Sequence, residues 1–481
     1  MMVLLAAVAA YGSACDDAPI EPAAEAGADA EAGVPLDAGS DTGVISDGGI
    51  DGSESDAAIP IVSCSKTFGN GVDRLLSASV TVDPKGNILF TGALSGSADF
   101  GGGALTSAGG FDLFVVKLDN SCKHVWSKRF GDAELQGGAN IVATPSGGSI
   151  VAGYFQGAID MGKGALTTSG TSIVLASLDA AGTVQWSKRF GGAGQQLVYD
   201  LSIDSEGNIL LAGAFNGDLD FGGGALSGPP PSDGGDIFLA KLDANGSHVW
   251  SRSFGPPAGG SVFASSIVTS ASGVIYASGN GQGTIDFGLG PIVFPASNEG
   301  SGTWIARFSS AGTILSVEAF KNVVAASRLR VGSELVVAGG IHGDADLGTG
   351  PLVITKPDGS TTHPKTFIST FSADGKRASM LRSFGRADFT QILDFGFSGF
   401  LPSTTEIAVS GRCIGPVDID GPCTPGSHKF LRFRLDGGLA SRTDHPAGPI
   451  ALTATQQFVV TGAQPPPGGS AETLTVTKFL P

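Results

Sequence analysis

The chain of 481 residues carries a formal net charge of −17, 75 glycines and only 15% charged residues. Glycine is more than twice as abundant as its usual share of about 7%, which excludes an ordinary helical protein, and no three-residue glycine period marks a collagen. No run of 18 apolar residues is present, so we expect no membrane-spanning helix in the mature protein. An acidic chain with 28 Lys and Arg residues lacks the basic surface that nucleic acid requires, so we expect no nucleic acid partner.

The first fifteen residues are typical of an export signal. An apolar run, residues 1–10, is followed by small residues and by Cys15. This arrangement resembles the lipobox of bacterial lipoproteins, in which the cysteine thiol is acylated and becomes the new N-terminus, although Gly12 stands where that family usually carries leucine. No basic residue precedes the apolar run, which a start codon further upstream would explain. The resemblance predicts lipidation of Cys15 and a place on the bacterial outer membrane or cell surface; cleavage after Ala14 and free secretion is the alternative.

Residues 16–62 are predicted to be a disordered acidic spacer. Between Asp16 and Ala58 the chain has twelve acidic residues and no Lys or Arg, which leaves 33 acidic against 28 basic residues elsewhere. Such a segment has too little apolar surface to offset chain entropy, and its like charges repel one another. Its Asp-Gly clusters are not followed by the twelve-residue loop ending in Glu that an EF-hand calcium site requires.

Residues 63–481 repeat one unit. Each unit has four short runs rich in Val, Ile, Leu and Phe, which we name A to D, separated by Gly, Asn, Asp and Ser turns that are typical of hairpins. The first and third units are nearly identical, with Ile88–Gly92 matching Ile209–Gly213 as run B. The glycine that ends run B recurs seven times, at Gly92, Gly153, Gly213, Gly279, Gly339, Gly411 and Gly462. In the first six units an aspartate follows seven residues later, at Asp99, Asp160, Asp220, Asp286, Asp346 and Asp418, whereas the seventh has Gly469 there.

This repeat predicts an all-β protein, a seven-bladed β-propeller. A unit of about 62 residues holds four strands, and such a blade buries both faces only between neighbouring blades, so that closing the ring protects the first and the last. The region begins at Cys64 with a D run that follows no A, B or C run, and it ends at Pro481 after a C run without a D run. The N-terminal strand is therefore predicted to complete the last blade.

Three segments of the unit resemble the SBBP-type bacterial β-propeller repeat. They are Gly-x6-Asp-Phe-Gly, Phe-x-x-Lys-Leu-Asp and Trp-Ser-Lys-x-Phe-Gly, found for example at Gly92–Gly101, Phe114–Asp119 and Trp126–Gly131. The resemblance covers residues 64–481, strongly in the first three units and weakly in the last two. It implies an exported, surface-exposed propeller and, for most members, no assigned chemistry. The order of spacer and glycine-rich propeller also resembles that of myxobacterial lipoproteins.

The six repeated aspartates lie in the loops between runs B and C, which are expected on the same face as the D-to-A loops. One hypothesis is a ring of carboxylates that binds a divalent cation such as calcium, or a basic partner. The other is that each aspartate accepts hydrogen bonds from its own loop and shapes a turn. Repetition in nearly every unit favours the structural role, because a binding site usually recruits a few different blades. We assign no firm metal ligand.

Four cysteines remain if Cys15 carries lipid, and an even number in an oxidising compartment favours disulfides. Cys413 and Cys423 lie ten residues apart in one Gly/Pro-rich loop and form the easiest pair, which leaves Cys64 to pair with Cys122. The alternative is that all four are buried thiols. No Cys-x-x-Cys unit supports a zinc site.

The hairpins between runs C and D resemble scaffold repeats of known propellers. Leu178–Trp186 and Leu242–Trp250 are similar to the tryptophan-docking repeats of quinoprotein dehydrogenases and, more loosely, to the Asp-boxes of sialidases. In both families these repeats hold blades together, so the resemblance supports propeller geometry rather than catalysis. The sequence has no His-x-x-x-His pair and no Gly-x-Ser-x-Gly elbow, and we assign no catalytic residue.

Two functions compete. The favoured one is a non-enzymatic, lipid-anchored cell-surface propeller that serves as a binding module or scaffold for a macromolecule or glycan, without a cofactor and with membrane contact through its anchor alone. The alternative is an extracellular polysaccharide hydrolase or lyase, or a redox enzyme, with its site on the face of the B-to-C loops. Inserts at Gly228–Pro231, Asn298–Gly300 and Cys413–Cys423 enlarge those loops, and lengthened loops often mark a working face.

Overall fold

Every regular element in the described part of the computed structural model is a β-strand. The chain divides into two units, residues 1–57 and 58–481. The structure describes residues 62–69, 74–230, 235–256, 260–294 and 302–321, and beyond residue 321 it describes chiefly the strands. Over these ranges no helix is long and apolar enough to cross a membrane. The predicted signal segment 1–15 and all but the last residue of the predicted spacer 16–62 lie outside the described residues.

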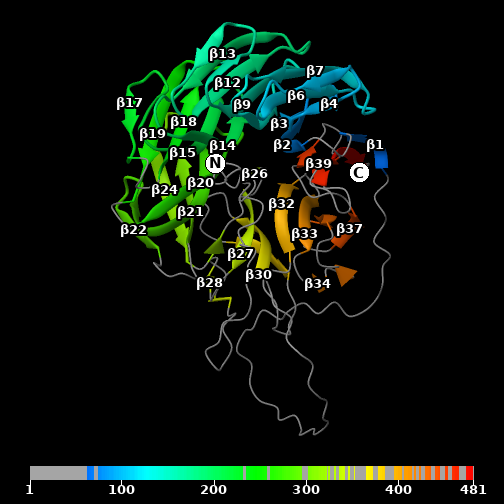
Figure 1. The fold of residues 1–481 in the computed structure, drawn as a ribbon. Coiled ribbons are helices and arrows are strands. Elements are labelled where there is room, and N and C mark those ends of the chain that lie inside the picture. Colours follow the sequence, from blue (N-terminus) through cyan, green and yellow to red (C-terminus); the bar gives the residue numbers. More distant parts are fainter. Residues whose placement is uncertain are drawn as a thin grey trace, which may run out of the picture. The chain divides into compact units, whose positions relative to one another are not determined.

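Runs A to D pair as four-stranded antiparallel sheets, which we number in chain order. Sheets 1 to 3 contain β2 (Arg74–Val82), β3 (Ile88–Ser95), β6 (Asp112–Leu118) and β7 (His124–Phe130); β8 (Gln136–Ala143), β9 (Ser149–Phe155), β12 (Ser172–Leu178) and β13 (Val184–Phe190); and β14 (Gln196–Ile203), β15 (Ile209–Phe215), β18 (Asp236–Leu242) and β19 (His248–Phe254). Sheets 4 to 6 contain β20 (Ser261–Thr269), β21 (Ile275–Asp286), β23 (Gly302–Phe308) and β24 (Ile314–Phe320); β25 (Val323–Val324), β27 (Leu335–Ile341), β30 (Lys365–Phe371) and β31 (Ala378–Phe384); and β32 (Phe395–Pro402), β33 (Glu406–Cys413), β36 (His428–Arg434) and β37 (Leu439–Asp444). Two short strands, β22 (Pro291–Phe294) and β26 (Arg330–Val331), extend sheets 4 and 5. Figure 1 colours these sheets in chain order.

The seventh sheet joins the two ends of this unit. It consists of β38 (Ile450–Leu452), β39 (Phe458–Gln464), β40 (Thr473–Phe479) and β1 (Val62–Phe68). Strand β1 runs antiparallel to β40, with Lys66 opposite Val476 and Phe68 opposite Leu474. The N-terminal strand therefore completes the last sheet, as the incomplete runs at both ends of the repeat region predicted.

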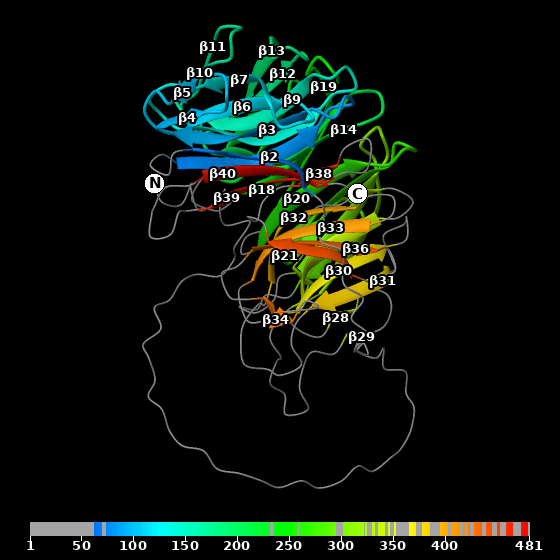
Figure 2. The same ribbon diagram turned by 90° about the vertical axis from the view of Figure 1, so that its right-hand side faces the viewer.

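Neighbouring sheets pack against one another in a closed series. We call the strand of run A the inner strand of its sheet and the strand of run D the outer strand. Inner strands contact one another from sheet to sheet, β2 with β8, β8 with β14, β14 with β20, β32 with β38, and β38 with β2, whereas sheet 5 makes its contacts through β26 with β20 and through β27 with β32. Figure 2 shows the C-terminal strand β40 beside β2 of sheet 1. Seven sheets of described strands, each in contact with two others, form a β-propeller, and the predicted all-β propeller is confirmed.

The hydrophobic core lies between the sheets. All seven residues of β6 and the first seven of β3 are buried, because neighbouring sheets cover both faces of these strands. At the boundary of sheets 7 and 1, Phe68 of β1 contacts Phe90 and Phe100, which in turn contact Phe114, and the contacting ring centroids lie 5.2 to 6.2 Å apart. Each buried phenylalanine contributes roughly 1.5–3 kcal/mol. The strand that closes the ring is thus also part of the core.

The glycine that ends run B lies in close contact with the backbone of the inner strand. In sheet 1 the register of β2 shifts between Ser77 and Ser79, opposite Gly92, and the corresponding shift occurs in sheets 2 to 4. A Cβ on this glycine would lie 1.8 to 2.4 Å from a carbonyl oxygen of the inner strand, at Gly92, Gly153, Gly213 and Gly279. The spacing found in the sequence therefore marks a position where a side chain has no room.

Candidate functional site

The repeated aspartates hold the turns of small hairpins that follow run B. The hairpins are β4 (Ser97–Asp99) with β5 (Ala104–Thr106), β10 (Ala158–Asp160) with β11 (Ala165–Thr167), β16 (Asp218–Asp220) with β17 (Ala225–Ser227), β28 (Ala345–Asp346) with β29 (Pro351–Leu352), and β34 (Val417–Asp418) with β35 (Pro422–Cys423). In sheet 4 the end of β21 and β22 form the same hairpin. Asp99 Oδ1 accepts hydrogen bonds from the amides of Gly101 and Gly103, at 2.7 and 3.0 Å.

The same pair of hydrogen bonds recurs in the next three repeats. Asp160, Asp220 and Asp286 each accept from two glycine amides at 2.6 to 3.2 Å. These glycines have positive φ, which suits the tight Asp-x-Gly-x-Gly turn. These bonds support the structural interpretation of the repeated aspartates.

The hairpin tips lie at the end of the sheet opposite to the one expected. A Cβ on Gly102 would lie 2.2 Å from the imidazole of His124, and one on Gly223 would lie 2.0 Å from that of His248. His124 and His248 begin the outer strands, where the C-to-D hairpins turn. The loop between runs B and C pairs with itself and doubles back along the outer strand, so its aspartate does not lie on the face of the B-to-C loops.

The described residues show no cluster of metal ligands. No three His, Cys, Asp or Glu side chains among them lie together in a way that would hold an ion. Asp346 ends β28 and is exposed, whereas Asp418 ends β34 with its side chain outside the described part. Calcium binding by the six repeated aspartates stays a prediction.

A histidine secures the hairpin to the outer strand in sheets 1 and 3. His124 Nε2 lies 3.1 Å from Ser127 Oγ, and His248 Nε2 lies 3.1 Å from Ser251 Oγ. In sheet 2 the glycine beneath the imidazole is replaced by Lys163 and the histidine by Val184. The remaining serine, Ser187, is consequently a buried hydroxyl without a hydrogen-bond partner.

Ser187→Ala is expected to raise the free energy of unfolding by about 1 kcal/mol, because it removes a buried hydroxyl that makes no hydrogen bond. The matched control is Ser127→Ala, which is expected to lower it by about 1 kcal/mol because His124 loses its partner. Equilibrium unfolding in urea measures both. Equal losses of stability in the two variants would contradict this account of Ser187.

Tryptophans of the outer strands dock on the next sheet. Trp126 Nε1 donates to the carbonyl of Ala180 at 3.2 Å, and its ring lies 2.8 Å from where a Cβ on Gly182 would stand. Trp250 Nε1 likewise donates to the Ser310 carbonyl, at 3.2 Å. We call this contact between an outer-strand tryptophan and the turn glycine of the next sheet a dock. Docks join sheet 1 to 2, 2 to 3 and 3 to 4, through Trp126 and Gly182, Trp186 and Gly246, and Trp250 and Gly312.

Two buried ion pairs reinforce these boundaries. Lys117 Nζ lies 2.8 Å from Asp83 Oδ2 within sheet 1, and it donates to the carbonyl oxygens of Gly147 and Ala180 in sheet 2 at 2.9 and 3.3 Å. In sheet 3, Lys241 pairs with Asp204 at 2.8 Å. Burial raises the pKa of Asp83, but hydrogen bonds from Lys117 and Asn87 and the Lys117 charge outweigh it, so the pKa lies below its ordinary value.

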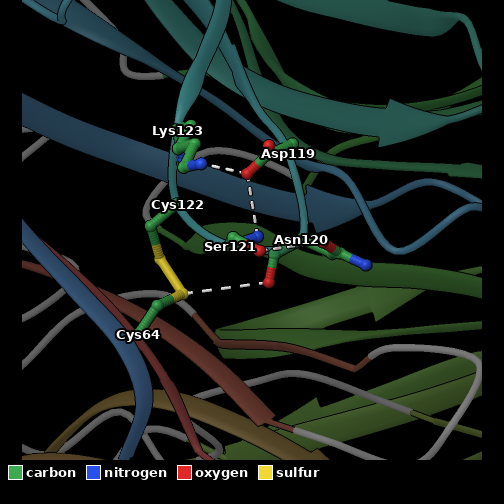
Figure 3. Close-up of a disulfide and its surroundings, with 6 residues drawn as sticks. All are labelled: Cys64, Asp119, Asn120, Ser121, Cys122 and Lys123. Carbon is green, nitrogen blue, oxygen red and sulfur yellow. Dashed lines mark hydrogen bonds between the residues drawn. A yellow bond between two sulfur atoms is a disulfide. The ribbon is translucent and has the colours of Figure 1, made fainter.

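A disulfide joins Cys64 of β1 to Cys122 in the C-to-D turn of sheet 1 (Figure 3). The pair is one of the two predicted, and the alternative of buried thiols is wrong for these two residues. Its Cα atoms lie 6.0 Å apart across a sequence separation of 58 residues. The backbones of Cys413 and Cys423 end β33 and β35, but their side chains lie outside the described residues, so that pair stays a prediction.

Sequence reasoning assigned no role to Asp83, Asp204, Lys117 or Lys241. Their signal was present, since the run C pattern Phe-x-x-Lys-Leu-Asp puts a lysine in an otherwise apolar strand in the first and third units. The same two units carry Asp in the A-to-B turn, whereas the second has Thr144 there and Ser177 in place of the lysine. Comparing units with one another would have paired these positions.

One family model of a β-propeller repeat matches part of the chain. Residues 185–220 match the SBBP family, described as a Beta-propeller repeat. No curated protein matches the chain. Solved structures similar to it include hydrazine synthase of Kuenenia stuttgartiensis, with a TM-score of 0.44 and 10% identity over 80% of this chain and 92% of that one. A puromycin-hydrolyzing peptidase of Mycobacterium tuberculosis has a TM-score of 0.41 and 12% identity over 85% of this chain and 53% of that one. The Pan2 WD40 domain of Neurospora crassa has a TM-score of 0.31 and 8% identity over 88% of this chain and 97% of that one.

The sheets and their contacts define the class of this protein, a β-propeller built from repeated sheets of four or five antiparallel strands. Within that class, residues 185–220 match the SBBP repeat, as the resemblance of the chain's segments predicted.

Proposed function

We propose that this protein is an exported, lipid-anchored propeller of the bacterial cell surface that acts as a binding module or scaffold for a macromolecule or glycan, without turnover. The observation that carries the proposal is how the described repeats use their polar and aromatic side chains. The aspartates hold turns, and the tryptophans and buried lysines join sheets. A frame built in this way is a stable support from which loops contact a partner.

The disulfide between Cys64 and Cys122 supports export, because disulfides persist in oxidising compartments. The apolar segment 1–10 before Cys15 and the acidic residues 16–58 support a tether that holds the propeller away from a membrane.

Cys15→Ala is expected to abolish anchoring, since the thiol that would carry the lipid is lost. The full chain produced in a bacterial host is extracted with a phase-separating detergent, and we expect wild type in the detergent phase and the variant in the aqueous phase. Ser13→Ala, which keeps Cys15 and a small neighbour, is the matched control and partitions like wild type. Equal partitioning of wild type and Cys15→Ala would contradict anchoring and support free secretion.

The binding role is tested with the full chain on an array of bacterial envelope polysaccharides and proteins, in calcium and in chelator, with product formation followed in parallel. We expect saturable binding of a macromolecule or glycan without cleavage or redox products, and none by the heat-unfolded chain. Release of sugar or peptide products, or electron transfer to a dye, would contradict the proposal and favour the extracellular hydrolase, lyase or redox enzyme. A melting temperature that chelator leaves unchanged would exclude a metal role for the repeated aspartates.

A further inference from the structure

The disulfide occupies the place that a dock occupies at other sheet boundaries. Cys64 is followed by Ser65 and Lys66 as Trp126 is followed by Ser127 and Lys128, so Cys64 stands at the tryptophan position of sheet 7. Cys122 stands at the turn position of the docking glycine.

The turn that carries Cys122 has the geometry of the docking turns. Cys122 has a φ of 61°, compared with 79°, 70° and 78° at Gly182, Gly246 and Gly312. Residues other than glycine rarely adopt this conformation. The Cys64 sulfur lies 4.0 Å from the carbonyl oxygen of Asn120, the position equivalent to the carbonyls of Ala180 and Ser310 that accept from tryptophan (Figure 3).

This boundary also differs from the others in how the chain crosses it. Sheets 1 to 4 follow one another along the chain, whereas β38, β39 and β40 are held to β1 by the backbone hydrogen bonds between β40 and β1. The position of β1 is fixed by the disulfide, by Phe68 in the aromatic cluster and by its link to β2. Whatever holds β1 therefore holds the ring closed.

We propose that the Cys64–Cys122 disulfide is a reversible latch on the ring-closing strand, in place of a tryptophan dock, and that thiol–disulfide exchange with an external dithiol opens the propeller at this boundary. Cys64 is partly exposed and Cys122 is buried, so a thiolate of the dithiol attacks the Cys64 sulfur and the Cys122 sulfur leaves as a thiolate that takes up a proton. The second thiol of the reductant then releases the Cys64 thiol. The protein gains two electrons and two protons, and the dithiol becomes a disulfide.

Amide hydrogen exchange of the folded full chain, with and without dithiothreitol, tests the latch. In the reduced protein we expect exchange about tenfold faster or more across residues 65–68 and 475–477, because the strands open locally, and unchanged exchange in β3 and β15. Exchange in β1 and β40 at the oxidised rate after reduction would overturn the proposal. This readout does not depend on lipidation or on a ligand, so its failure is distinct from failure of the proposed function.

Cys64→Trp with Cys122→Gly rebuilds the tryptophan and glycine of a dock at this boundary. We expect this double variant to exchange slowly in both conditions, and Cys64→Ser with Cys122→Ser to exchange fast in both. Equally fast exchange in the two double variants would overturn the equivalence of disulfide and dock. Should the serine variant fail to fold, wild type reduced after folding provides the unlatched reference.

Discussion

Gly213→Ala is expected to lower the free energy of unfolding by about 3 kcal/mol, the upper part of the usual range for overpacking a core. The new Cβ would lie 2.0 Å from the carbonyl oxygen of Leu197 and 2.7 Å from the ring of Phe238. The first neighbour is backbone of the inner strand and the second is a fully buried side chain, so neither moves aside cheaply. Equilibrium unfolding in denaturant measures the loss.

Gly192→Ala is the matched control in a neighbouring loop. The nearest atom to a Cβ there is the end of the Arg189 side chain at 3.9 Å, so we expect little change. A Gly213→Ala variant as stable as Gly192→Ala would show that the repeated glycine serves something other than close packing of two strands.

The repeat allowed the ring of sheets to be predicted from the sequence. The glycine that recurs from Gly92 to Gly462, with an aspartate seven residues later in six of the seven units, predicted the unit, and the incomplete runs at Cys64 and Pro481 predicted the closure, because both follow from counting along the chain. The pairing of β1 with β40 required no knowledge of side-chain distances, since two unmatched strands have one free place each.

The doubled-back hairpins could not be predicted from the sequence, and the reason is physical. Strands β4 and β5 have three residues each, too few to show an alternating pattern, and Ser97–Asp99 and Ala104–Thr106 look like an ordinary polar loop. Asp99 and Asp220 were accordingly expected on the wrong face, although hydrogen bonding of each aspartate to the backbone of its own loop was among the expectations.

Contacts between sheets also could not be predicted from the sequence of one repeat unit alone. The dock of Trp126 on Gly182 and the disulfide of Cys64 with Cys122 join residues about one repeat apart, and neither partner is marked within its own unit. Sequence proximity ranked Cys413 with Cys423 as the easiest pair, whereas closure of the ring is what brings Cys64 to Cys122. The pairing of Cys64 with Cys122 was predicted as what remained, and propagating the predicted ring to side-chain positions would have given that pair its physical reason and would have found the dock.

Lys117→Met is expected to lower the free energy of unfolding at pH 7 by about 3 kcal/mol, because it leaves the Asp83 carboxylate buried without its cation. The side chains of Lys117 and Asp83 are 4% and 1% exposed, so water replaces little of what is lost. The carbonyl oxygens of Gly147 and Ala180 in sheet 2 lose their donor as well. A loss below about 0.5 kcal/mol, the size of a surface pair, would contradict this account.

The second sheet supplies the control for this pair, because it has Thr144 and Ser177 at the positions of Asp83 and Lys117. Asp83→Thr with Lys117→Ser removes both charges, and we expect it to be more stable than Lys117→Met alone, as a double-mutant cycle would measure.

The pH dependence of stability gives a second test of this ion pair. In wild type the pKa of Asp83 is lowered, so the contribution of its carboxylate to the free energy of unfolding is present above the unfolded pKa and is lost as the pH falls through the folded value. Without Lys117 the buried carboxyl takes up a proton at higher pH, which removes the uncompensated charge. The stability difference between wild type and Lys117→Met should therefore narrow as the pH falls from about 7 to about 4, and a difference that widens would show that the charge of Asp83 is not what the lysine offsets.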